Sequence, residues 1–159
     1  MKIKKIGVPV FGAFLVMALN VRAQVPVPPD KDQLLKGDAA GQSSVAERNG
    51  FPAPQIIISF KDQLGLTKDQ VKKIDEIVTN LPFAATVKGQ EIIDAEEELN
   101  RLFESGSVNE KTLRAKLERI GKMRAELRFV HLQVYLKEKQ ILSVKQWERL
   151  KELQASEVK

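Results

Sequence analysis

The 159-residue chain contains no cysteine, one histidine, one tryptophan and one tyrosine. Without cysteine the protein has no disulfide framework, so its stability must come from apolar burial and association. The chain also lacks a P-loop, a HExxH motif, a dinucleotide-binding glycine motif and a Ser-His-Asp arrangement. We therefore predict that the protein is not an enzyme and needs no cofactor.

The first 23 residues have the three-part layout of a cleavable secretory signal peptide. Three lysines precede an uncharged run over residues 6–21, and small or aliphatic residues stand three and one positions before a cut after Ala23. The run is shorter than the roughly 20 residues of a membrane-spanning helix, and it contains Pro9. We predict export, cleavage near Ala23 and no stable membrane insertion.

Removal of the leader also changes the net charge from which a partner class is predicted. The whole chain carries a formal net charge of +5, which would favour a nucleic-acid partner through phosphate neutralisation. All four charged residues of the leader are positive, so its removal leaves +1. We therefore predict no nucleic-acid partner.

Residues 24–54 are rich in proline, glycine and serine and poor in large apolar side chains. This composition is typical of a flexible linker. A helical domain over residues 55–155 should follow, although the run of three isoleucines at its start would also suit an edge strand. The first apolar residues of the domain that fit helical spacing are Ile56, Ile57, Phe60 and Leu64.

Two segments carry the same signal for the start of a helix. In each, a hydroxyl residue suited to the N-cap is followed three residues later by a glutamine that can reach back, and apolar residues flank the cap. A third start is predicted at Ser107, with Glu110 three residues later. The motif residues are Leu66, Thr67 and Gln70 in the first segment, and Leu142, Ser143, Gln146 and Trp147 in the second.

The helix that begins at Thr67 should kink or break near Pro82, and its periodicity resumes until Gly106. The next helix is the longest. Residues 57–104 carry a net charge of −4 and residues 105–159 a net charge of +6, so the arms of an antiparallel hairpin would attract one another. The segment Phe129–Leu136 is apolar on nearly all sides, which favours cover by a second subunit.

The paired motifs resemble the LTxxQ signatures of the Spy/CpxP family of periplasmic proteins, which is related to periplasmic heavy-metal-resistance sensors. The resemblance extends over roughly Phe60 to Leu153 and includes the spacing of about 75 residues between the motifs; Ser143 replaces the usual threonine of the second. It implies an elongated all-α fold of about four helices, commonly a curved antiparallel dimer whose concave face holds partly folded proteins without ATP.

The candidate sites each have a structural alternative. A helix-capping role accounts for the motif residues without a ligand. For His131, a buried and hydrogen-bonded structural role is favoured over a metal-ligand role, because the chain has no cysteine and no second histidine. The acidic run of Asp94, Glu96, Glu97 and Glu98 suits a solvated face. The residues predicted to contact clients or a dimer partner are Ile56, Ile57, Phe60, Phe129, Val130, Leu132 and Leu136.

We therefore predict an ATP-independent chaperone or envelope-stress protein of the periplasm, which binds unfolded or misfolded proteins and forms a homodimer. A heavy-metal sensor or resistance protein is the first alternative. A regulatory module that binds an envelope sensor or another signalling partner is the second.

Overall fold

The computed structural model describes residues 27–37, 41 and 43–157, so the predicted signal peptide lies outside the described part of the chain. The described residues form six helices and no strand, and the predicted all-α class is confirmed. The helices are α1 (Lys31–Leu35), α2 (Ser44–Glu47), α3 (Pro54–Ser59), α4 (Lys68–Glu104), α5 (Glu110–Ile141) and α6 (Val144–Glu157).

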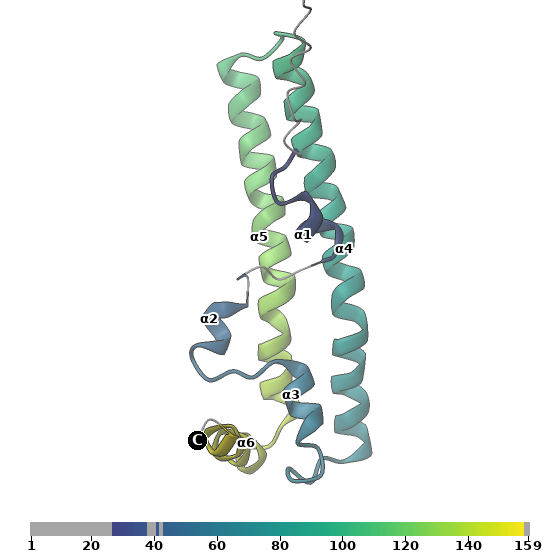
Figure 1. Ribbon diagram of the computed structural model, residues 1–159, viewed down its shortest axis with the longest axis vertical. Helices are drawn as coiled ribbons and strands as arrows, with labels where there is room; N and C mark the ends of the chain where they lie inside the picture. The colour runs from purple at the N-terminus through teal and green to yellow at the C-terminus, as the bar shows by residue number, and fades with distance from the viewer. Residues whose placement is uncertain (1–26, 38–40, 42, 158–159) are drawn as a thin grey trace, which may run out of the picture.

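Helices α4 and α5 form a long antiparallel hairpin that sets the length of the molecule (Figure 1). Helix α4 has 37 residues, which corresponds to roughly 55 Å at 1.5 Å per residue. Gly106 closes its C-terminus with φ +66°, and the Ser107 amide donates to the Leu102 carbonyl. The tight closure turns the chain back so that α5 can run beside α4.

Of the predicted kink or break at Pro82, the break does not occur, because helix α4 continues through this residue. Proline removes one backbone donor, which weakens a helix without preventing it where packing holds the turns on both sides. Ile74 and Ala85 are both buried on either side of the proline. The Thr86 hydroxyl also donates to the Pro82 carbonyl at 2.8 Å.

Helix α5 begins two residues later than predicted, because Asn109 is its N-cap and not Ser107. The Asn109 side chain accepts from the Thr112 amide, and the Thr112 hydroxyl oxygen accepts from the Asn109 amide, both at 3.0 Å. Asparagine caps a helix at least as well as serine. Ser107 is instead paired with the Ser105 hydroxyl.

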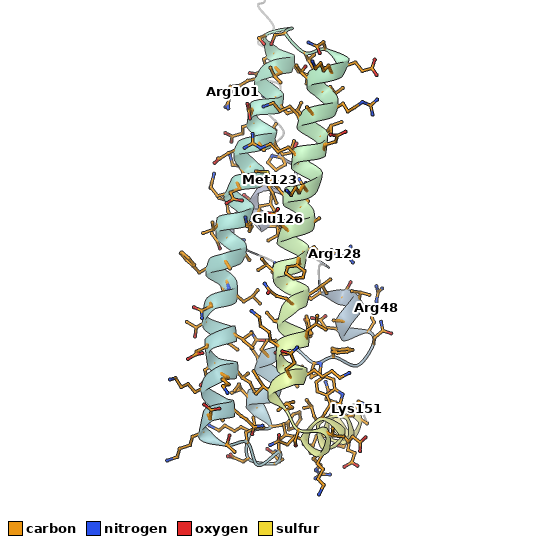
Figure 2. The ribbon with its side chains drawn as sticks, turned by 180° about the vertical axis from the view of Figure 1, so that it is seen from behind. Arg48, Arg101, Met123, Glu126, Arg128 and Lys151 are labelled. Carbon is orange, nitrogen blue, oxygen red and sulfur yellow. The ribbon has the colours of Figure 1, made fainter. Side chains whose placement is uncertain are left out.

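The small helices α1 and α3 lie on one face of the hairpin, with α2 beside α5 (Figure 1). The view from behind shows α4 and α5 uncovered by other helices (Figure 2). Part of the segment predicted to be a linker is therefore packed: α1 and α2 belong to it, and Leu34 of α1 is buried. Burial of Leu34 and Pro28, together with ion pairs of Asp30 and Lys31, attaches the α1 part of this segment, which composition alone did not reveal.

Two apolar clusters hold the hairpin at different levels. The lower one joins the base of the hairpin to α3 and α6, and the middle one joins α4 and α5 to α1. No helix within the described residues is both long and apolar enough to cross a membrane. The buried members are Ile57, Phe60, Leu64, Ile74, Leu142 and Leu150 in the lower cluster, and Leu34, Ala85, Ile92, Ile93 and Leu127 in the middle one.

Candidate functional site

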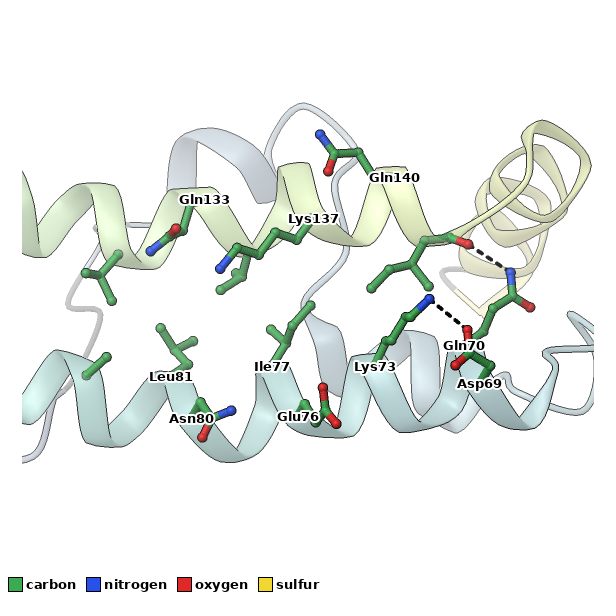
Figure 3. Close-up of a pocket in the computed structure, with 14 residues that line it drawn as sticks. Asp69, Gln70, Lys73, Glu76, Ile77, Asn80, Leu81, Gln133, Lys137 and Gln140 are labelled. Atoms are coloured by element: carbon green, nitrogen blue, oxygen red, sulfur yellow. Dashed lines mark hydrogen bonds and ion pairs between the residues drawn. The ribbon is translucent and has the colours of Figure 1, made fainter.

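A groove of about 560 Å³ lies between the lower halves of α4 and α5. Figure 3 shows Ile77 and Leu81 of α4 pointing into it. Apolar side chains of α5 complete its floor, and amides and charged groups form its rims. The lining includes Ile77, Leu81 and Ala84 of α4, Val130, Val134 and Ile141 of α5, and Asn80, Gln133 and Gln140 on the rims.

Two exposed phenylalanines flank the upper end of the groove. Phe83 precedes the lining residue Ala84 and is 76% exposed, and Phe129 precedes the lining residue Val130 and is 62% exposed. One residue turns a helix by about 100°, so each ring lies on the outer flank of its own helix. The Lys88–Glu126 ion pair places these parts of α4 and α5 at the same level. The groove therefore has an apolar floor, and an exposed phenylalanine lies on the outer side of each helix beside its upper end.

The predicted contact residues divide into two groups. Ile57 and Phe60 are buried in the lower cluster and contribute to stability, so they are not a surface in this structure. Phe129 and Leu136 are exposed, the latter by 57%, and Val130 lines the groove. Ile56 is exposed on α3, and Leu132 is partly buried on α5.

The α4 side of the groove and the neighbouring Phe83 were missed in the sequence. Ile77, Leu81 and Ala84 repeat at four and three residues, which is a helical stripe that could have indicated this face. The kink or break expected at Pro82 interrupted that stripe. Because the helix is continuous, residues before and after the proline share one surface.

The two motifs lie together at the base of the hairpin and are joined through their glutamines. The Gln70 side-chain amide nitrogen donates to Gln146 Oε1 at 2.8 Å, and the Gln146 nitrogen donates to Gln70 Oε1 at 3.1 Å. Each glutamine also caps its own helix: Gln70 Oε1 accepts from the Thr67 amide and Gln146 Oε1 from the Ser143 amide. We call this arrangement the glutamine clasp.

The glutamine clasp closes the lower end of the groove. Gln70 lines the groove and donates to the Ile141 carbonyl at 2.8 Å (Figure 3). Gln146 lies within 3.4 Å of the Leu64 and Gly65 carbonyls, which connects α6 to the loop before α4. The clasp therefore fixes the spacing of α4 and α5 at the groove.

Charged groups on the groove rim are solvated. Lys73 lies 2.7 Å from Asp69, and this hydrogen bond raises the pKa of Lys73. Lys137 and Glu76 also line the groove and are exposed. The rim thus offers both signs of charge to a ligand, without a concentrated positive or negative site.

Two residues of the acidic run are paired across the hairpin, and a third is paired with α1. Glu96 accepts from Arg124 at 3.0 Å, Glu97 accepts from Lys31 at 2.7 Å, and Glu98 pairs with Lys116 and Arg119. The hydrogen bond from Lys116 lowers the pKa of Glu98. The attraction predicted between the two arms is therefore present as ion pairs.

A buried acid lies on the covered side of α5. Glu138 is fully buried, and among the described residues neither of its carboxylate oxygens has a hydrogen-bond partner. Burial raises its pKa to about 8. Nearby on α5, Tyr135 donates to Glu47 at 2.9 Å, and burial raises the pKa of Tyr135 to about 12.

His131 is buried on the same helix. Within the described residues, no group of three or more histidine, cysteine, aspartate or glutamate side chains is arranged to hold a metal ion. The imidazole of His131 is therefore a buried side chain of α5 in this structure.

Comparisons with known proteins add no relative. No protein-family model matches the chain. No curated protein and no solved structure matches it either.

Proposed function

We propose that this protein is an ATP-independent chaperone that binds exposed apolar segments of unfolded or misfolded proteins. The observation that carries the proposal is the groove on the uncovered face of the hairpin, with its apolar floor and the two exposed phenylalanines beside its upper end. Apolar burial contributes roughly 1.5–3 kcal/mol per side chain with little directional demand, which suits varied clients.

The rims of the groove suit a polypeptide ligand. Asn80, Gln133 and Gln140 carry side-chain amides that can donate to and accept from a peptide backbone. Each non-proline residue of an unfolded segment offers a backbone N–H donor and a C=O acceptor that are not engaged in secondary structure. An apolar floor between polar rims therefore matches the chemistry of an extended segment with intermittent large apolar side chains.

The proposal includes the compartment and the assembly that the family resemblance implies. The protein acts in the periplasm after removal of residues 1–23, and it works as a homodimer. Phe129 and Leu136 are exposed on α5, where a second copy or a client could cover them. Sedimentation of the mature protein would measure the assembly separately from client binding.

The test compares the aggregation of a chemically denatured client with and without the protein at stoichiometric amounts. The wild-type protein should suppress light scattering without ATP. The double variant Phe83→Ser and Phe129→Ser should lose most of this suppression. Both side chains are largely exposed, so the fold should not depend on them.

A matched control is available near the tip of the hairpin. Phe103 on α4 and Leu117 on α5 are 54% and 52% exposed and, unlike Phe83 and Phe129, are not adjacent in sequence to any residue that lines the groove. The variant Phe103→Ser and Leu117→Ser should suppress aggregation as well as the wild-type protein does. The proposal fails if the wild-type protein leaves aggregation unchanged, and the groove is the wrong surface if both double variants are equally impaired.

A further inference from the structure

Residues 27–37 form a strap that is seated on the covered face of the hairpin. Leu34 is only 4% exposed and packs among Ala85, Ile92, Ile93 and Leu127 of the middle cluster. The strap is one short turn of helix and contributes one large side chain to the cluster. Its leucine thus enters the hairpin as the anchor of a bound peptide would.

Helix α4 is shaped to receive the backbone of the strap. Gly89 is buried in α4, and a Cβ atom at this position would overlap the Leu34 carbonyl. Gly37 has φ +61° and lies against Thr86 and Pro82. Any side chain at position 89 would prevent the strap from packing against α4. The contact therefore depends on the absence of a Cβ atom at Gly89.

A polar frame fixes the orientation of the strap. Arg124 of α5 donates to both carboxylate oxygens of Asp30, at 2.7 and 3.2 Å, and also to Glu96 of α4 at 3.0 Å. Lys31 donates to Glu97 at 2.7 Å. The hydrogen bond from Arg124 lowers the pKa of Asp30. The site therefore selects an acidic residue, a basic residue next to it, and a leucine three residues after the basic one.

We propose that this slot is a peptide-recognition site and that the strap is its built-in occupant. The external partner it fits is a segment of another protein with the strap's own pattern: aspartate, lysine, two further residues and leucine. The strap covers the slot until such a segment displaces it. The slot lies on the covered face of the hairpin, and so it does not depend on the groove proposed above.

The probe is a labelled synthetic peptide with the sequence of residues 27–37, titrated into the full chain and followed by fluorescence anisotropy. The variant Leu34→Asp should undock the chain's own strap because a charge would enter an apolar cluster. The slot residues are unchanged, so this variant should bind the peptide at least tenfold more tightly than the wild-type protein. In the wild-type protein the tethered strap competes at a high effective concentration.

Two controls separate recognition from non-specific sticking. A peptide with aspartate in place of Leu34 should not bind the Leu34→Asp protein. Adding Gly89→Ala to that protein should abolish binding of the original peptide, because the new Cβ occupies the place of its carbonyl.

A second variant keeps the test decisive if Leu34→Asp fails to fold. Asp30→Ala with Lys31→Ala removes only partly exposed ion pairs of the strap and leaves Leu34 in place. Peptide binding should again exceed that of the wild-type protein. The proposal is overturned if a variant that shows cooperative unfolding binds the peptide no better than the wild-type protein does.

Discussion

The side chain of Glu138 is unusual, because its carboxyl group is fully buried and no described residue supplies it with a hydrogen bond. Its pKa of about 8 in the folded protein lies above the ordinary value of 4.5. Between these two values the folded state holds more protons than the unfolded state, so stability falls as the pH rises. The stabilising contribution is fully present below pH 4.5 and is lost as the pH passes through about 8.

The prediction is that the wild-type protein loses stability from pH 5 to pH 9 relative to Glu138→Gln, which cannot ionise. The difference should be on the order of a few kcal/mol. Urea unfolding at several pH values would measure it. Equal pH dependence in both proteins would mean that the carboxyl group finds a partner or water on ionisation.

The glutamine clasp predicts coupling between residues that are 76 positions apart. Gln70→Ala and Gln146→Ala should each cost about 1–2 kcal/mol, because each removes a helix cap and a cross-motif hydrogen bond. The double variant should cost less than the sum of the two, with a coupling energy of about 0.5–3 kcal/mol. Denaturant unfolding of the four proteins measures this cycle, and strict additivity would show that the two motifs act only as separate caps.

The local part of the glutamine clasp, its two helix caps, could be predicted from the sequence. Thr67 with Gln70 and Ser143 with Gln146 are recognisable because a cap needs residues only three apart. The bonds between the two glutamines depend on how α4 and α6 meet, and no local pattern encodes that. The identity of the buried acid was hidden for the same reason, since Glu138 looks like any other charged residue of a long helix.

At the scale of elements, Pro82 should weaken the helix that it does not break. It leaves one carbonyl of the preceding turn without its helical donor. Pro82→Ala should therefore stabilise the protein by roughly 1–3 kcal/mol. Thermal or urea unfolding would measure the gain, with Thr79→Ala, at an exposed position of the same helix, as a control that should change stability by no more than about 0.5 kcal/mol.

The long helices were predictable because their apolar stripes and caps repeat over many residues. The short helices were harder, since α1 has only five residues and its position depends on Leu34 meeting Gly89. Such a contact joins segments more than 50 residues apart. Composition favoured a linker, and packing against the hairpin gave this segment its structure.

At the scale of the whole molecule, apolar packing is concentrated in the lower and middle thirds of the hairpin. From residue 96 to residue 119 no side chain of either arm is buried. Ion pairs such as Lys116–Glu98 and Arg119–Glu98 hold this tip, and exposed pairs contribute little each. The tip therefore has few of the interactions that resist local opening.

We accordingly expect amide hydrogen exchange to be fastest in the tip and slowest around Ile74 and Ile92, which are fully buried. Mass spectrometry of peptides from residues 96–119 and from the two clusters would measure the difference.

The experiment should be repeated over a range of protein concentrations. If a second copy covers the tip in solution, protection of the tip against exchange should rise with protein concentration. If the dimer does not cover the tip, its exchange rate should not depend on concentration. Protection of the tip equal to that of the clusters, even at high dilution, would contradict the view that burial alone sets the order of local stability in this fold.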